Sequence, residues 1–204
     1  MMKSITTLLT SVAFVLMAPT SMAEEGFTPL FDGKTLDGWR VSEHPDSFKV
    51  TDGAIVAHGP RGHAFYVGDF NAATFVDFEL RLEALTKPNS NGGVFFHTNW
   101  VESGWPRNGY EVQVNNTQKD WRKSGGLYAV VDNKEPFEDN TWMKYVIRVE
   151  KGVVTVSVNG RELVNYTPKG EDNKLQKNGG AIALQAHDPG SEVHYRNIRI
   201  KPLK

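Results

Sequence analysis

The sequence contains no cysteine. A disulfide framework and a lipid-modified cysteine are therefore excluded, so the stability of the fold must come from a packed core. Three common catalytic signatures are also missing, namely the G-x-S-x-G nucleophile elbow, the phosphate-binding P-loop and the H-E-x-x-H zinc-binding helix. An enzyme built on this chain would have to use a different arrangement of residues.

The chain has no excess of either charge, with 23 Lys and Arg side chains against 24 Asp and Glu and a formal net charge of −1. The two signs are interspersed along the sequence. Binding to nucleic acid or to an anionic membrane surface depends on a strongly basic face. We therefore expect neither as a partner.

Long apolar runs are missing after the first 23 residues. The run Leu8–Met17 is too short to cross a bilayer comfortably, so we expect no membrane span. It follows the basic Lys3 and precedes Ser21-Met22-Ala23, the order typical of a signal peptide with its cleavage site. We expect residues 1–23 to be removed and the protein to be exported to the periplasm or to the extracellular space.

Helical periodicity is almost absent from residues 24–204, whereas short alternating segments recur about every ten residues. Strands are expected over residues 48–50, 54–57, 75–85, 94–98, 110–115, 127–131, 143–150, 153–158, 162–166, 181–186 and 194–200. Asn159-Gly160 is a strong signal for a tight hairpin. The pattern predicts a single all-β domain over residues 24–204, a two-sheet antiparallel jelly-roll sandwich.

The same alternation predicts the core. The side chains expected to point inward are Phe78, Leu80, Leu82, Val112, Val114, Ile147, Val156 and Leu184. Val76 and Ala84 are expected to share the face of Phe78, and Trp39 and Trp142 are also assigned to the core.

Polar residues alternate with two of these apolar sets. Glu111 and Gln113 point away from Val112 and Val114, and Gln185 and His187 point away from Leu184. A carboxylate, two amides and an imidazole on neighbouring strands could transfer protons and bind a sugar. The alternative is a solvated sheet face without function.

Several other side chains have two interpretations. Glu79, on the polar face of residues 75–85, could belong to a site or form an ion pair with Arg81. Trp105 and Trp121 lie in the two longest irregular stretches and could stack on sugar rings or fasten their loops to the body. No metal site or cofactor is predicted, because the spacing of His58 and His63 suits an exposed turn as well as a metal.

Two terminal motifs and six internal ones resemble a known family. The terminal motifs are FDGKTLDGWRV (residues 31–41) and VHYRNIRIKPL (residues 193–203), and between them lie FELRLE, NGGVFFHT, GYEVQV, GGLYAV, VNG and IALQAH. In this order they resemble the 3-keto-disaccharide hydrolases, a bacterial family of exported, sugar-acting proteins. The resemblance covers nearly all of residues 24–204 and implies a concanavalin-like or laminin-G-like sandwich with carbohydrate as the partner.

The resemblance also implies a reaction. A glycoside whose sugar carries a ketone at carbon 3 has an acidic proton on carbon 2, so a base can remove it and the group on carbon 1 can leave, after which water adds. The case for ordinary retaining hydrolysis is weakened, because the E-x-D-x-E ladder of laminarinase-like sandwich glycosidases is missing. No feature of the sequence separates hydrolysis from elimination followed by hydration.

For the site, the resemblance favours Glu111 and His187 as the proton-transferring pair. Residues expected to bind substrate are Gln113, Gln185, His97, Glu79, Arg196, Trp105 and Trp121. Arg196 could stabilise an enolate or pair with a carboxylate, and His97 stands where an arginine is expected in many relatives. The competing hypotheses are a non-catalytic, lectin-like carbohydrate-binding module and a structural domain of the cell envelope.

Overall fold

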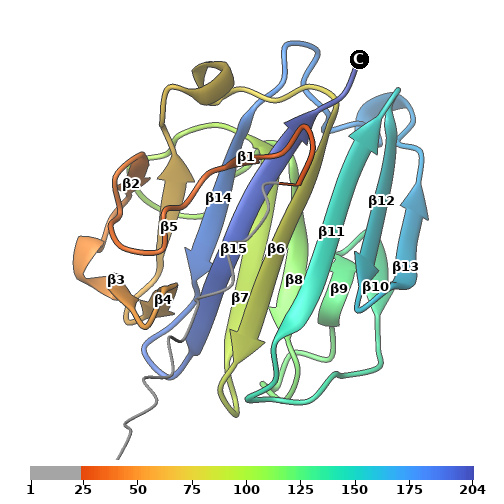
Figure 1. Cartoon of the computed structure of the whole chain (residues 1–204). Coiled ribbons are helices and arrows are strands. Elements are labelled where there is room, and N and C mark those ends of the chain that lie inside the picture. Colours follow the sequence, from red (N-terminus) through yellow and green to blue (C-terminus); the bar gives the residue numbers. More distant parts are fainter. Residues whose placement is uncertain (1–23) are drawn as a thin grey trace, which may run out of the picture.

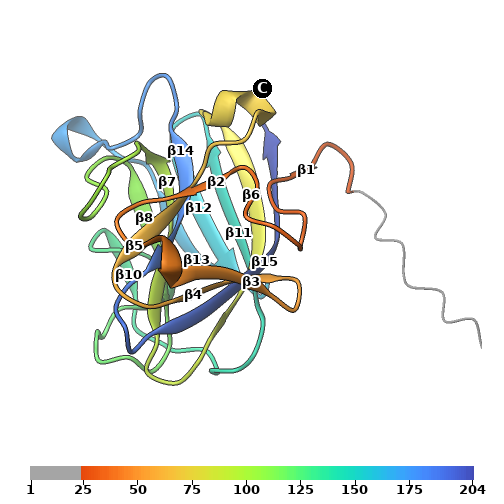
Figure 2. The same ribbon diagram turned by 90° about the vertical axis from the view of Figure 1, so that its left-hand side faces the viewer.

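A computed structural model describes residues 24–204 as two antiparallel sheets packed face to face (Figures 1 and 2). The fold is the predicted all-β jelly-roll sandwich, in which the only helical elements of residues 24–204 are three short 3-10 turns, Pro45–Ser47, Phe70–Ala73 and Gly170–Asp172. The expected signal peptide lies outside the described residues. No helix within residues 24–204 is long and apolar enough to cross a membrane.

We call the two layers the back sheet, which lies nearer the viewer in Figure 1, and the front sheet, which lies behind it in that view. The back sheet runs in the order β13 (Arg161–Tyr166), β12 (Val153–Val158), β11 (Met143–Glu150), β6 (Phe78–Thr86), β15 (Glu192–Pro202), β4 (Ala54–His58) and β3 (Phe48–Thr51), and β1 (Thr28–Pro29) pairs with β15. The front sheet runs in the order β10 (Val131–Asn133), β9 (Lys123–Leu127), β8 (Tyr110–Asn115), β7 (Asn91–Thr98), β14 (Ala181–Ala186), β5 (Gly62–Tyr66) and β2 (Trp39–Val41).

The core between the sheets confirms the predicted alternation. Phe78, Leu80, Leu82, Ala84, Val112, Val114, Ile147, Val156, Leu184 and Trp39 are all buried. Two back-sheet tyrosines cross this core: the hydroxyl of Tyr145 donates to the carbonyl of Gln113 over 3.2 Å, and that of Tyr195 lies 3.4 Å from the carbonyls of Gly93 and Gln185. These bonds tie the back sheet to the backbone of β7, β8 and β14.

Two core assignments are wrong. Val76 is 46% exposed, because the paired part of its strand begins only at Phe78. Trp142 is half-buried and lies outside the core, with the guanidinium of Arg196 3.8 Å from its ring centroid. In both cases the residue stands just before its strand, where alternation no longer fixes the face.

Some strand boundaries also differ from the prediction. Residues 128–130 form a turn between β9 and β10, not the middle of a strand. The strands β5 and β9 were not predicted, because their sequences GHAFY and KSGGL contain glycine and lack an alternating apolar pattern. The omission of β5 from the prediction matters, because this strand forms part of the front sheet.

Burial of Leu80 supplies a test of this core. Truncation of Leu80 to Ala should lower the free energy of unfolding by about 2 to 5 kcal/mol, the range for a large-to-small core change. The matched control, Val76→Ala, truncates an exposed side chain near the same strand. It should change the free energy of unfolding by no more than about 0.5 kcal/mol. Denaturant unfolding measures both, and equal effects would contradict the assigned core.

Candidate active site

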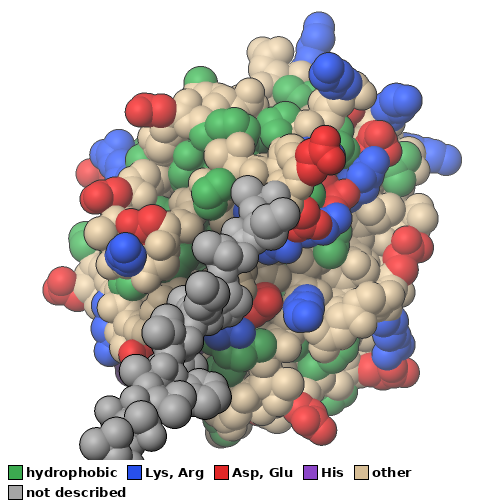
Figure 3. All heavy atoms as spheres, in the orientation of Figure 1, with side chains coloured by type: hydrophobic (Ala, Val, Ile, Leu, Met, Phe, Trp, Pro, Cys, Tyr) green, Lys and Arg blue, Asp and Glu red, His purple; other side chains and the backbone are tan. Residues whose placement is uncertain are grey.

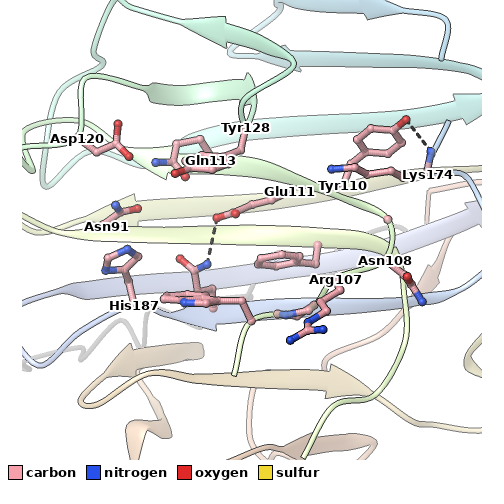
Figure 4. A pocket seen from close by; sticks show the side chains of 15 residues that line it. Asn91, Arg107, Asn108, Tyr110, Glu111, Gln113, Asp120, Tyr128, Lys174 and His187 are labelled. Atoms are coloured by element: carbon pink, nitrogen blue, oxygen red, sulfur yellow. Dashed lines mark hydrogen bonds between the residues drawn. The ribbon is translucent and has the colours of Figure 1, made fainter. Parts of the chain in front are cut away.

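A cavity of about 310 Å³ opens on the outer face of the front sheet (Figure 4). Its floor is formed by side chains of β7, β8 and β14, and its walls come from the segments around Trp105, Asp120 and Lys174. Glu111, Gln113, Gln185, His187 and Trp105, five of the residues expected from the sequence, line this one cavity. The sandwich therefore brings together side chains that are more than 70 positions apart in the chain.

Glu111 extends from β8 across the neighbouring strand β7. Its carboxylate Oε1 accepts a hydrogen bond of 3.0 Å from Nε2 of Gln185 on β14. The side chain can take this path because residue 93 of β7 is glycine, and a Cβ atom there would collide with the Glu111 carboxylate. Gly93 therefore gives the carboxylate its position.

Removal from water raises the pKa of Glu111 to about 8, against the opposing effect of the Gln185 hydrogen bond; the charge of Asp120 contributes in the same direction as burial. At neutral pH the carboxyl group is therefore mostly protonated. Such a group can donate a proton to a reacting atom and can take one back after it has ionised.

His187 follows β14 and faces the same cavity. Its Nδ1 lies 2.7 Å from Oδ2 of Asp188. Partial burial acts to raise the pKa of Asp188, but hydrogen bonds from His187, from the Ser191 hydroxyl and from the Gly190 amide outweigh it and hold the pKa below its usual value. Since the ionised Asp188 only accepts hydrogen bonds, His187 carries its proton on Nδ1 and, when neutral, offers Nε2 as a base.

Several buried amide atoms around the cavity have no hydrogen-bond partner within the described residues. Both polar side-chain atoms of Gln113, Oε1 of Gln185 and Oδ1 of Asn91 make no hydrogen bond within residues 24–204. An unsatisfied buried polar group costs about 1 to 3 kcal/mol, so such atoms are retained where they bind water or a ligand. Three amides around one carboxyl group suit a ligand rich in hydroxyl groups.

The loop 99–109 forms one wall of the cavity. Its Trp105 ring lies 5.3 Å from the ring of His187. The amide of Gly104 donates to Oε2 of Glu43, and Oε1 of the same carboxylate pairs with Arg61 over 2.8 Å. Hydrogen bonds from Arg61 and Gly104 lower the pKa of Glu43 to about 2, so this anchor stays ionised at any physiological pH.

Two expected binding residues lie on the opposite side of the molecule. Glu79 is on the outer face of the back sheet, where it pairs with Arg81 and with Arg148 over 2.7 Å. Arg196 lies on the same face, 2.8 Å from Glu83. Acidic and basic side chains are interspersed over this face (Figure 3). The expectation for both residues is corrected: they form surface ion pairs remote from the cavity.

His97 and Trp121 also do not line the cavity. His97 is buried at the end of β7, where its Nδ1 accepts from the amide of Gln176 and its Nε2 donates to the carbonyl of Val76, so it tethers two loops. Trp121 is 49% exposed and lies 4.7 Å from the guanidinium of Arg122, beside the cavity.

Sequence reasoning missed several cavity residues. Asn91, Phe95, Asp120, Tyr128 and Lys174 line it without having been singled out. The signal for Asn91 was present, because it begins the glycine-containing segment NGGVFFHT. The others stand in segments whose polar or apolar side chains gave no indication of which sheet they would join.

His58 and His63 separate onto different sheets. His58 ends β4 of the back sheet, whereas His63 lies in β5 of the front sheet and is fully buried. The exposed-turn interpretation is therefore wrong for His63. Residues 24–204 contain no group of three or more side chains placed to hold a metal ion.

The fold and the cavity define a carbohydrate-active jelly-roll protein, with a carboxyl group, an imidazole and unpaired amides beside a tryptophan. The chain belongs to the 3-keto-alpha-glucoside-1,2-lyase-like family, whose model matches residues 26–201. A protein of Bacteroides thetaiotaomicron named 3-keto-disaccharide hydrolase is 28% identical over an alignment of 234 positions, and the alignment covers 88% of this chain and 79% of that protein. The resemblance noted from the sequence is thereby confirmed.

Solved structures agree on the fold. A crystal structure of a candidate glycosyl hydrolase from Parabacteroides distasonis has a TM-score of 0.72 at 23% identity, covering 88% of this chain and 95% of that one. The carbohydrate-binding module CBM66 from Bacillus subtilis has a TM-score of 0.59 at 13% identity, covering 80% of this chain and 95% of the module. The same sandwich is thus used by proteins described as glycosidases and by sugar-binding modules.

The raised pKa of Glu111 makes stability depend on pH. The folded state holds the proton of Glu111 more tightly than the unfolded state does. The contribution of this group to the free energy of unfolding of the wild type is therefore fully present below about pH 4.5 and is lost as the pH rises toward about 8. Glu111→Gln cannot ionise, so its stability relative to wild type should increase over that interval. Unfolding titrations at several pH values measure this, with the exposed Glu171→Gln as the control. Parallel pH profiles for wild type and Glu111→Gln would contradict the assignment.

Proposed function

We propose that this protein cleaves the glycosidic bond of 3-keto glycosides or 3-keto disaccharides in the front-sheet cavity. The observation that carries the proposal is the presence in one cavity of two proton-transfer groups, Glu111, whose burial favours the protonated carboxyl group, and His187, whose Nδ1 lies 2.7 Å from the Asp188 carboxylate. Membership of the family supports the choice of a 3-keto sugar as substrate.

The first half of the reaction is an elimination. Nε2 of His187 removes the proton from carbon 2, which the ketone at carbon 3 makes acidic. The electron pair of that C–H bond first forms an enolate with the ketone at carbon 3. The ketone then re-forms as the electron pair moves into a double bond between carbons 1 and 2, and the bond from carbon 1 to the leaving oxygen breaks. Glu111 donates its proton to that oxygen, so the leaving group departs as a neutral alcohol.

The second half returns both groups to their starting states. The ionised Glu111 takes a proton from water as the water oxygen bonds to carbon 1, and the protonated His187 returns a proton to carbon 2. The product is the free 3-keto sugar. The enolate charge that forms at the oxygen on carbon 3 needs a hydrogen-bond donor, and the unpaired Nε2 of Gln113 can supply one, while Oε1 of Gln113 and Oε1 of Gln185 supply acceptors for hydroxyl groups.

A non-catalytic sugar-binding role is the second candidate. It is favoured by the fold shared with a carbohydrate-binding module and by Trp105, which is 43% exposed and lines the cavity. Aromatic faces suit the apolar faces of sugar rings. Binding alone, however, gives no reason for a carboxyl group to be held protonated beside an oriented imidazole.

Substitution of the two groups distinguishes these functions. Glu111→Gln and His187→Ala should each lower turnover of a 3-keto glycoside by about a hundredfold or more, the scale for a positioned acid or base. The exposed residues Glu171 and His44, changed to Gln and Ala, serve as matched controls and should leave turnover unchanged.

The assay is aglycone release from a chromogenic glucoside and from its 3-keto form. Release from the 3-keto form that needs both residues supports the proposal. Sugar binding without release from any 3-keto substrate would support the binding module, and activity indifferent to both substitutions would place the catalytic groups elsewhere.

We also propose that the protein is exported, on the basis of the leader-like pattern of residues 1–23. The mature protein would then begin at Glu24. Amino-terminal sequencing of protein recovered outside the cytoplasm tests this, and a sequence beginning at Met1 or Met2 would contradict it.

A further inference from the structure

His63 is a polar residue that the proposed reaction does not use. It lies in β5 with 0% of its surface exposed, and neither ring nitrogen makes a hydrogen bond within residues 24–204. Its neighbours Ala64 and Tyr66 belong to the core between the sheets, so the alternation of the strand directs His63 to the outer face of the front sheet. This is the face that carries the cavity.

The ring of His63 is enclosed by aromatic side chains. Its centroid lies 5.2 Å from that of Phe95 and 5.6 Å from that of Trp105, both of which line the cavity. His63 itself does not line the open cavity. Trp105 therefore separates an unsatisfied imidazole from the space in which a ligand would bind.

Burial, assisted by the charge of Arg61, lowers the pKa of His63 to about 4. The imidazole is therefore uncharged at neutral pH and offers one N–H donor and one nitrogen acceptor. A neutral buried imidazole that lacks both partners is costly compared with a phenyl ring of similar shape, so its retention points to a partner that enters from outside.

The nearest polar neighbour on the sheet is also incomplete. His63 is the register partner of Gln185 across β5 and β14. The amide nitrogen of Gln185 is bonded to Glu111, whereas its Oε1 is buried and unpaired. An N–H donor on His63 and a carbonyl acceptor on Gln185 thus stand side by side, next to the carboxyl group that the proposed reaction uses.

We propose that His63 and Gln185 form an oxygen-binding subsite beneath Trp105, which takes a hydroxyl or ketone oxygen of the sugar held in the cavity. A hydroxyl accepts from His63 and donates to Gln185, whereas a ketone oxygen accepts from His63 alone. The subsite rests on the proposed function, in that its ligand is the sugar, and it adds a specificity-determining residue that the reaction scheme lacks.

Access to this subsite requires a shift of Trp105. The loop that carries the ring is held by the bond from the Gly104 amide to Glu43, and the guanidinium of Arg61 lies 5.1 Å from the Trp105 ring centroid. The anchor fixes the loop backbone beside Trp105 while its ring stays 43% exposed. A rotation of the side chain, with the loop in place, brings His63 into the cavity.

The variant His63→Phe separates a binding role from a packing role. Phenylalanine keeps an aromatic ring against Phe95 and Trp105 but has no polar atom to satisfy. We expect His63→Phe to unfold at the same or a higher denaturant concentration than wild type. We also expect it to bind sugar about tenfold more weakly or worse, the scale for loss of a hydrogen bond that a site is built to make. The exposed His44→Phe is the control and should change neither property.

The experiment measures dissociation constants by calorimetry for methyl glucoside and for its 3-keto form, each with and without His63→Phe. The protein carries Glu111→Gln, which slows consumption of the keto sugar by about a hundredfold or more. Weaker binding of both sugars indicates a hydroxyl ligand, and weaker binding of the keto sugar alone indicates the ketone oxygen; either supports the subsite. Unchanged affinities, or no binding of either sugar at millimolar concentration, overturn it.

A spectroscopic readout keeps this test separate from catalysis. The ring nitrogen signals of His63 in ¹⁵N-labelled protein should shift when methyl glucoside is added, even if no substrate is ever cleaved. If the protein releases no aglycone but shows this shift, the proposed reaction is refuted and the subsite is supported. If the protein is active while the His63 signals stay fixed, the reaction is supported and the subsite is refuted.

Discussion

The site depends on two adjacent glycines, Gly92 and Gly93, near the start of β7. A Cβ atom at Gly92 would lie 2.7 Å from the hydroxyl of Tyr195 on the core side, and one at Gly93 would collide with the carboxylate of Glu111 on the cavity side. Successive residues of a strand face opposite sides of the sheet. The pair therefore lets the core close against one face of β7 while Glu111 crosses the other face to reach Gln185.

Charge is distributed unevenly around the cavity. Burial keeps both Glu111 and His63 uncharged at neutral pH, one by raising its pKa and the other by lowering it. Asp188 and Glu43, which do not line the cavity but contact His187 and Gly104, are held ionised by hydrogen bonds. The buried groups are thus uncharged in the resting state and these two ionised groups have partners, so no unpaired ion is buried among them.

The sequence was informative where one face of a strand is buried and uninformative about which sheet a strand joins. Alternation placed Glu111 and Gln185 correctly, since Val112 and Leu184 had to face the core. The same logic failed for Glu79, because β6 shows equally clear alternation but belongs to the back sheet. His63 was not predicted as a site residue, because the segment GHAFY is buried on both faces. Its sequence therefore shows no alternation of apolar and polar residues that would assign His63 to one face.

The proposed reaction requires removal of the proton on carbon 2 of a 3-keto sugar in the front-sheet cavity. Cleavage of a 3-keto glucoside in D₂O examines this step, with an enzyme-free sample to measure background exchange. If His187 removes this proton, the released sugar should carry deuterium on carbon 2 well above background, because the proton exchanges with solvent before water adds. Product that retains its original hydrogen on carbon 2, at the background level of exchange, would instead indicate direct displacement at carbon 1 and would overturn the proposed elimination.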